Sequence, residues 1–220
     1  MSKLRIRRID PLYPQPDLIR EAASIIKRGG VVAFPTRFLY GLGADAFCKS
    51  AVEKIFAMKR RSHDKPILIF IKSKCELARF VRYIPPVALH LIEVFWPGKI
   101  TIIFKASDIV PINLTAGTGK IGIRLPEHPV ALAIADAVKY PVTGTSANLS
   151  ENRGCSSISE LDSRIEEKLD LILDAGSLKG GIGSTVVDVT GDYPKILREG
   201  KISAGDINSA IARHARRIFI

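Results

Sequence analysis

Short apolar runs alternate with segments of helical periodicity along most of the chain, and this alternation constrains the fold more than any other feature. The apolar runs expected to form strands are 31–34, 66–71, 99–106, 120–126, 141–147, 169–176, 184–191 and 194–200. The segments expected to form helices are 17–29, 50–60, 85–95 and 129–138. Strands that alternate with helices favour an α/β fold around a largely buried sheet.

Turn-forming residues set the expected ends of these helices. Gly29 and Gly30 follow the first helix, and glycine commonly closes a helix. Ser50 is the expected N-cap of the second helix, with Glu53 completing a capping box. The third helix is expected to stop at the Trp-Pro-Gly sequence of residues 96–98, because proline does not continue a helix.

The chain carries an excess of positive charge, which favours polyanionic partners. Among its 220 residues, 33 Lys and Arg stand against 22 Asp and Glu, so the formal net charge is +11. Nucleotides, RNA and phosphorylated metabolites are ligands of this kind, and net charge alone does not choose among them. An ordinary solvated basic surface is the alternative explanation for part of this excess.

Other features of the sequence disfavour several classes of protein. No apolar stretch reaches 18 residues, so we expect neither a membrane-spanning helix nor a membrane partner. Residues 1–16 carry charge without an apolar core, unlike a secretory signal. Cys48, Cys75 and Cys155 are odd in number and widely spaced, which indicates a reducing, cytoplasmic compartment. With no repeat or linker in the sequence, one domain over residues 1–220 is expected.

Familiar cofactor motifs are present only in part. Residues 117–122 match G-x-G-x-x-G, but an apolar strand-like run follows them where a dinucleotide-binding loop requires a helix. Residues 176–185 are glycine-rich but lack the G-K-[ST] ending of a Walker loop. The four histidines are scattered without metal-ligand spacing, so no protein-held metal site is expected.

Polar groups that suit phosphate or carboxylate binding gather where three expected strands begin or end. The segment KRRSHDKP at 59–66 is strongly basic and directly precedes a strand. PVTGTSANLS at 141–150 and GGIGSTVVDV at 180–189 supply hydroxyls, an amide and glycines that let a ligand approach the backbone. Each segment alone is also compatible with an ordinary solvated loop or polar turn.

Taken together and in order, the motifs resemble the YrdC/Sua5 family over about residues 17–203. The motifs are FPT…YGLGADA, KIFAMKRR…KPI, WPG…T, GIRLPEHP, GTSANLS, GSTVVDV and ILREG. The resemblance implies a YrdC-like domain, a twisted mixed open sheet flanked by helices with a basic concave face. A basic C-terminal helix would follow the core in what is expected to be the short, single-domain form.

Members of this family are L-threonylcarbamoyladenylate synthases, so the resemblance implies a nucleotidyltransferase. Such enzymes form threonylcarbamoyl-AMP and pyrophosphate from L-threonine, bicarbonate and ATP, for N6-threonylcarbamoyladenosine at position 37 of tRNA (t6A37). The implied cofactor is Mg²⁺ carried with ATP, and the implied macromolecular partners are the proteins of the later transfer step. The basic face is a possible site for tRNA or other RNA.

The resemblance also implies a role for individual residues. Lys59 and Arg61 of the K-x-R motif would be the catalytic cations beside the phosphates. The implied threonine contacts are Thr36, Arg124, whose guanidinium would pair with the carboxylate, and Ser184. The implied ATP contacts are Arg61, Lys65, Lys120, Ser146, Asn148 and Arg198. Residues 41–43 are expected to let the chain bend away from the pocket.

Four positions depart from the family pattern. Arg37 stands where Asp or Glu is usual, Lys99 replaces a proline, Phe70 replaces a histidine of some relatives, and Glu151 replaces a glycine. These departures leave open an acyl-adenylate enzyme with another amine substrate. A non-catalytic RNA-binding paralogue would fit the net charge as well.

Overall fold

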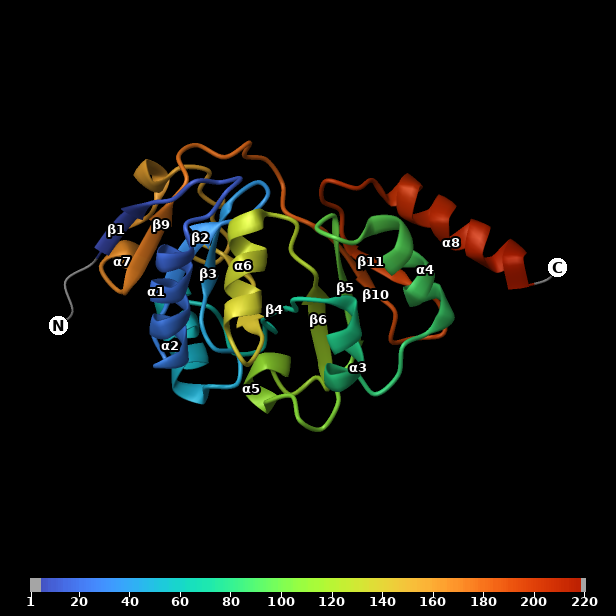
Figure 1. The fold of residues 1–220 in the computed structure, drawn as a ribbon. Coiled ribbons are helices and arrows are strands. Elements are labelled where there is room, and N and C mark those ends of the chain that lie inside the picture. Colours follow the sequence, from blue (N-terminus) through green and yellow to red (C-terminus); the bar gives the residue numbers. More distant parts are fainter. Residues whose placement is uncertain (1–4, 219–220) are drawn as a thin grey trace.

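The strands of this protein form two mixed sheets flanked by helices (Figure 1). The structure is a computed structural model that describes residues 5–218. The five-stranded sheet has the order β1 (Arg5–Arg8), β9 (Leu171–Asp174), β2 (Val32–Pro35), β3 (Tyr40–Gly43), β8 (Thr145–Ser146). The six-stranded sheet has the order β11 (Lys195–Arg198), β10 (Thr185–Asp188), β5 (Ile100–Lys105), β6 (Lys120–Arg124), β4 (Ile69–Phe70), β7 (Val142–Thr143). The α/β class and the open mixed character are confirmed, with two sheets in place of a single one.

Helices cover both sheets. The helices are α1 (Pro16–Lys27), α2 (Lys49–Lys59), α3 (Leu77–Phe80), α4 (Pro86–Phe95), α5 (Ile112–Thr115), α6 (Pro129–Ala137), α7 (Ser163–Glu166) and α8 (Ala204–Ile218). Short 3₁₀ turns lie at Lys74–Glu76 and Ile158–Glu160. α1 and α6 pack together against the five-stranded sheet, and α8 packs against α4 beside the six-stranded sheet (Figure 1). No helix among residues 5–218 is long and apolar enough to cross a membrane.

The predicted helix ends are correct for α1 and wrong for α2. Gly29 follows α1 with a φ of 78°, the left-handed conformation expected of a closing glycine. α2 begins before the predicted cap, because the Cys48 carbonyl accepts the N–H groups of Ala51 and Val52. Ser50 therefore lies inside the helix, and no side chain caps this N-terminus.

Two predicted strand features also differ from the structure. The run 66–71 contributes only the two residues of β4, since the Ile67 N–H bonds to Leu114 outside either sheet. Residues 41–43 do not bend the chain away but belong to β3, which pairs antiparallel with β2. At Gly43 glycine is needed for close packing, because a Cβ there would lie 2.4 Å from the Phe34 ring.

The chain passes directly from one sheet to the other at Gly144. β7 belongs to the six-stranded sheet and β8 to the five-stranded sheet, with Gly144 alone between them. A Cβ at this position would lie 2.3 Å from Leu68 and 2.7 Å from Phe70, so the crossing accepts only glycine without rearrangement. A further bridge between Asp45 and Val142 ties the sheets at the same place.

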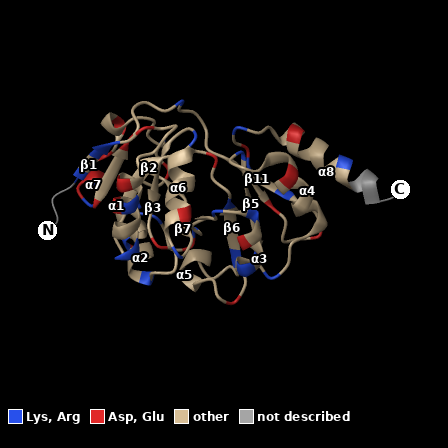
Figure 2. Cartoon of the chain, in the orientation of Figure 1, with Lys and Arg blue, Asp and Glu red and all other residues tan. Residues whose placement is uncertain are grey.

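Charged side chains are spread over both sheets rather than confined to one of them (Figure 2). On β1 the arginines are paired, since Arg5 and Arg7 contact Glu21 on α1 and Arg8 contacts Asp174 on β9. These ion pairs hold an exposed edge strand against its neighbours, which gives part of the positive charge a structural role.

Candidate active site

A cavity of about 1380 Å³ lies between the two sheets. β3 and β8 supply one part of its wall, and β5, β6, β10 and β11 supply another. Its charged lining residues are Lys59, Arg61, Lys120, Arg124, Arg153, Arg198, Glu151, Glu160 and Asp188. Six cationic side chains against three acidic ones favour an anionic ligand.

Nine of the ten predicted site residues line this cavity. They are Thr36, Lys59, Arg61, Lys120, Arg124, Ser146, Asn148, Ser184 and Arg198. Lys65 is the exception, because its Nζ lies 2.8 Å from Glu151 in an exposed ion pair and the side chain does not contribute to the wall. The structure thus brings together residues up to 162 positions apart in the sequence (198 − 36), while their chemical roles remain predictions.

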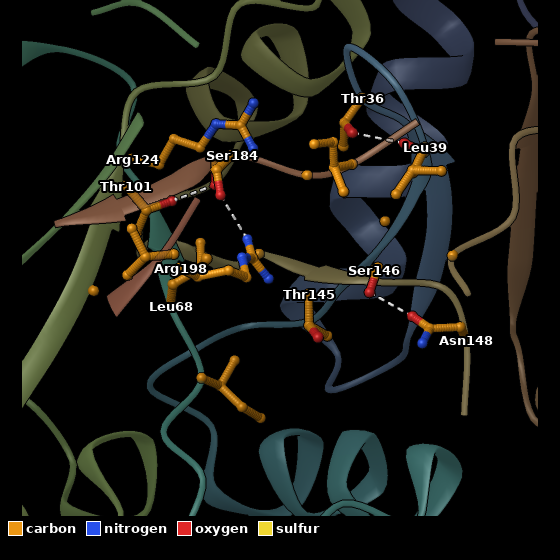
Figure 3. A pocket seen from close by; sticks show the side chains of 18 of the residues that line it. Thr36, Leu39, Leu68, Thr101, Arg124, Thr145, Ser146, Asn148, Ser184 and Arg198 are labelled. Carbon is orange, nitrogen blue, oxygen red and sulfur yellow. Dashed lines mark hydrogen bonds between the residues drawn. The ribbon is translucent and has the colours of Figure 1, made fainter. Parts of the chain in front are cut away.

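One end of the cavity, which we call the guanidinium end, contains Arg124, Arg198, Ser184 and Thr101. Figure 3 shows the two arginines on opposite sides of Ser184. Arg198 donates to the Ser184 carbonyl at 2.7 Å, and the Ser184 hydroxyl lies 2.8 Å from that of Thr101. Thr101 is the threonine of the WPG…T motif, but no role in the site was predicted for it from the sequence.

Arg124 is a buried cation with an incomplete set of partners. Its side chain is 9% exposed, and its Nε has no hydrogen-bond partner among the described residues. Burial lowers the pKa of Arg124 to about 10, with Glu127 opposing the shift and Arg198 and Arg37 adding to it. An unpaired buried cation is costly, so an anion bound here would restore favourable interactions.

Arg37 has a partner on the other sheet, Glu127. Arg37 lies in the turn between β2 and β3 and pairs with Glu127, which follows β6 in the other sheet. Neither side chain lines the cavity. Beside it, the Thr36 hydroxyl donates to the Leu39 carbonyl at 2.6 Å and keeps its lone pairs as acceptors (Figure 3).

The opposite end, which we call the loop end, contains Lys59 and residues 146–152. Lys59 is the last residue of α2 and is 2% exposed. Its Nζ donates to the Ser146 carbonyl, to the Asn148 carbonyl at 2.6 Å and to the Asn148 Oδ1 at 3.3 Å. Burial, reinforced by the Arg61 charge, lowers the pKa of Lys59 to about 7.

Arg61 faces the same end from the loop after α2. Its Nε donates to the Lys65 carbonyl at 3.0 Å and its Nη2 to the Pro66 carbonyl at 2.7 Å. These bonds fix the side chain against its own loop. Lys120, farther along the wall, pairs with Asp188 at 2.9 Å.

The acidic residues of the cavity do not form a metal centre. Asp188 and Glu151 pair with lysines, and Glu160 accepts from the backbone N–H groups of Ser156 and Ser157. Among residues 5–218, no three His, Cys, Asp or Glu side chains are grouped so that they could hold a metal ion.

Comparison with known proteins gives the relationship of this chain. The family model covering Sua5, YciO and YrdC, described as "Telomere recombination", matches residues 24–200. The chain belongs to the Sua5/YciO/YrdC family. The resemblance stated from the sequence motifs is therefore confirmed.

The relatives that are similar to the chain include threonylcarbamoyl-AMP synthases and an uncharacterized protein, YciO. The chain is 36% identical to threonylcarbamoyl-AMP synthase of Pyrococcus abyssi, over 88% of this chain and 57% of that protein. It is 34% identical to threonylcarbamoyl-AMP synthase of Bacillus subtilis, over 92% of this chain and 59% of that protein. The chain thus spans about three fifths of the length of these relatives. It is also 33% identical to the uncharacterized protein YciO of Escherichia coli, over 90% of this chain and 95% of YciO.

Solved structures of two of these three relatives also match the chain. P. abyssi Sua5 in complex with L-threonine matches with a TM-score of 0.88 and 34% identity, over 96% of this chain and 61% of that one. E. coli YciO matches with a TM-score of 0.84 and 32% identity, over 94% of this chain and 100% of YciO. The YrdC-like fold is confirmed by both, and the choice between their activities depends on the site.

Proposed function

We propose that this protein is a threonylcarbamoyl-AMP synthase, which combines L-threonine, bicarbonate and ATP. The observation that carries the proposal is Arg124, a buried guanidinium with an unpartnered Nε in a cationic cavity. A carboxylate is the anion that fits a planar guanidinium best, and an amino acid supplies one. The L-threonine bound to the related P. abyssi protein supports this assignment.

The reaction suits a site that holds cations and lacks a grouped set of catalytic acids and bases. The neutral threonine amine and bicarbonate form a carbamate with loss of water, and the carbamate attacks the α-phosphorus of ATP through one carboxylate oxygen. The bond from this phosphorus to the bridging oxygen of the β-phosphate breaks, and pyrophosphate leaves with the bonding electrons. Orienting the two anions and offsetting their repulsion are the main tasks of the protein.

The two ends of the cavity divide this task in the proposed complex. Arg124, Ser184 and Thr36 hold the amino acid at the guanidinium end, while Arg61 faces the triphosphate at the loop end. Arg198 belongs to the guanidinium end and Lys120 lies farther along the wall, and both line the same cavity, where they would be available to the nucleotide. Lys65, which is paired with Glu151 outside the wall, would reach the phosphates only by leaving that partner.

Mg²⁺ would accompany ATP rather than occupy a protein site of its own. The cavity carboxylates are already paired, and Mg²⁺ is commonly held by substrate phosphates and water with few protein ligands. When bound with the nucleotide it would offset the charge of the phosphates. The product would serve the proteins that transfer the threonylcarbamoyl group to tRNA.

A second candidate is an acyl-adenylate enzyme that uses another amine. It is favoured by the near full-length match to YciO and by Phe70, which lines the cavity with Leu68 where some family members have histidine. These two side chains give the amine pocket an apolar wall (Figure 3 labels Leu68). The same assay distinguishes this candidate from the first.

The test is the release of pyrophosphate by the purified protein from ATP and bicarbonate with single amino acids. We expect release that requires both threonine and bicarbonate, together with threonylcarbamoyl-AMP detected by mass spectrometry. Release with another amino acid alone would support the second candidate. No turnover with any amino acid, combined with salt-sensitive RNA binding, would contradict both candidates and favour an RNA-binding protein.

A further inference from the structure

Lys59 has no hydrogen left with which to contact a phosphate. An ammonium group carries three N–H donors, and three oxygens of residues 146 and 148 accept from it. Its side chain is also almost fully buried. To reach a ligand, Lys59 would have to give up at least one of these bonds. Loss of the bond to the Asn148 carbonyl would cost about 1–3 kcal/mol, because the Ser146 carbonyl and the Asn148 Oδ1 accept from other donors as well.

Asn148 is equally occupied. Its Oδ1 accepts from Lys59 and from the Ser146 hydroxyl, while its Nδ2 donates to the carbonyls of Leu149 and Asn152, both at 2.7 Å. Two donors and two acceptors exhaust the side-chain amide. The bonds hold the backbone from residue 146 to residue 152 in one conformation.

The main chain of Lys59 takes part in the same arrangement. The Ser150 N–H donates to the Lys59 carbonyl at 2.8 Å. Lys59 therefore contacts this loop twice: its carbonyl accepts from Ser150, and its ammonium group donates to Ser146 and Asn148. α2 in this way holds the loop against β3, with which β8 is paired.

Arg61 differs from Lys59 although both belong to the K-x-R motif. Within residues 5–218, only two of its five N–H groups have hydrogen-bond partners, and both partners belong to the adjacent turn. A guanidinium anchored along one edge keeps donors free for a phosphate. The two cations of the motif therefore have different tasks.

We propose that Lys59 is a positioning residue, a clamp that shapes residues 146–152 from behind, and that Arg61 is the cation of this motif that contacts the triphosphate. The proposal rests on the proposed function only in taking ATP as the ligand. It makes Lys59, Ser146 and Asn148 one hydrogen-bonded unit, in which Lys59 and Asn148 are buried and which acts on the nucleotide through the form of the loop rather than through direct contact.

The decisive experiment compares the binding of AMP, ADP and ATP to wild-type protein, Lys59→Met and Arg61→Gln by isothermal titration calorimetry. No amino acid is added, so nothing turns over. Loss of a phosphate contact should grow with the number of phosphates, because each adds negative charge. We expect Arg61→Gln to weaken ATP binding at least tenfold more than AMP binding, and Lys59→Met to weaken both by the same factor within about threefold.

Lys59→Arg is the matched control. Arginine commonly replaces a lysine that binds phosphate, but its planar guanidinium does not fit three acceptors arranged around one buried nitrogen. We therefore expect Lys59→Arg to bind nucleotides as weakly as Lys59→Met does. An ATP-selective loss in Lys59→Met, or wild-type affinity in Lys59→Arg, would overturn the proposal.

A measurement on wild-type protein keeps the proposal testable if these variants do not fold. In protein labelled with ¹⁵N-lysine, the Lys59 ammonium protons should exchange slowly with water, both free and saturated with ATP. Loss of this protection on ATP binding would show that the clamp opens and would overturn the proposal. If wild-type protein binds no nucleotide, the proposed function is contradicted. That result differs from an ATP-selective loss in Lys59→Met, which contradicts only the role given to Lys59, and the calorimetric titrations distinguish the two.

Discussion

The two ends of the cavity use polar side chains in opposite ways. At the loop end, Lys59 and Asn148 are fully hydrogen-bonded within the protein. At the guanidinium end, Arg124 is as deeply buried as Asn148, 9% exposed in each case, yet its Nε has no partner. A saturated buried group supports its surroundings, whereas an unsaturated one is the better candidate for ligand contact.

The largest effect is expected from Arg124→Met, which removes the unsaturated cation. We expect kcat/KM for the amino acid to fall at least 100-fold, about 3 kcal/mol, because charge-assisted hydrogen bonds to the carboxylate are lost. The free energy of unfolding should stay the same or rise, since a buried unpaired charge is replaced by an apolar side chain of similar length. Steady-state pyrophosphate release and urea unfolding measure the two quantities.

Arg82→Met is the control for that variant, because Arg82 lies on the surface in an exposed pair with Asp108. It should leave both quantities nearly unchanged. A loss of stability in Arg124→Met comparable to that of a core variant would place Arg124 with the saturated groups and remove the contrast between the two ends.

The second effect is a pH dependence of the loop end. The pKa of Lys59 is lowered from 10.5 to about 7, and the charged or titratable groups that act on it are Arg61 and Cys155. Burial raises the pKa of Cys155 to about 11, so this thiol stays neutral near pH 7. As pH rises through 7, folded Lys59 loses a proton and one of its three hydrogen bonds, and we expect ATP affinity to fall up to about tenfold between pH 6 and 8.5.

Stability should change in the opposite direction over a similar range. The unfolded chain keeps the Lys59 proton up to about pH 10.5, so between pH 7 and 10.5 the unfolded state binds more protons than the folded state. The Lys59 contribution to the free energy of unfolding therefore rises with pH in this window. In Lys59→Met, we expect neither the fall in ATP affinity nor the rise in stability with pH. An ATP affinity of the wild-type protein that does not change with pH would contradict the loss of a proton by Lys59 near pH 7.

A smaller effect is expected from the Arg37–Glu127 pair, which tunes the guanidinium end from outside the cavity. Glu127 stabilises the charge of Arg124, and Arg37 opposes it. Glu127→Gln leaves the arginines uncompensated, so amino-acid binding should become about two- to fivefold tighter, and Arg37→Ala should weaken it by a similar factor. Equal and same-direction changes in both variants would indicate that the pair acts by bridging the sheets rather than by charge.

The smallest effect concerns Glu151, at the rim of the loop end. Its φ is 72°, a left-handed conformation that costs a non-glycine residue free energy. Glu151→Gly should raise Tm by about 2–4 °C in thermal unfolding. Glu151→Gln, which loses the charge that pairs with Lys65 but keeps the strain, should not raise it.

The fold could be predicted in outline because its signals are local. Helical periodicity and flanking turn residues were enough to predict α1, α4 and α6. The division into two sheets was not predicted, because it depends on a crossing at Gly144 that two nearby side chains impose. Ser50 and Glu53 matched a capping box that the earlier start of α2 made unnecessary.

The membership of the site was easier to predict than the behaviour of its residues. Motif order identified ten residues, of which nine line one cavity, while Lys65 pairs with Glu151 and does not line it. That Lys59 is saturated and Arg61 is not depends on hydrogen bonds across the fold, to residues 146–148 in one case and to 65–66 in the other. Sequence spacing carries no information about such a difference.

The mixing of early and late strands in both sheets has a consequence for synthesis on the ribosome. β1 pairs with β9, so Arg5 has no strand partner until Leu171 has been made, and β5 pairs with β10, about half as far apart in the chain, with Ile100 opposite Thr185. Neither sheet can close from the amino-terminal half alone, and contacts of this range form slowly. The cavity acquires Ser184 and Arg198 only when nearly the whole chain has emerged, so a truncated product would expose unpaired strand edges and would lack part of the guanidinium end.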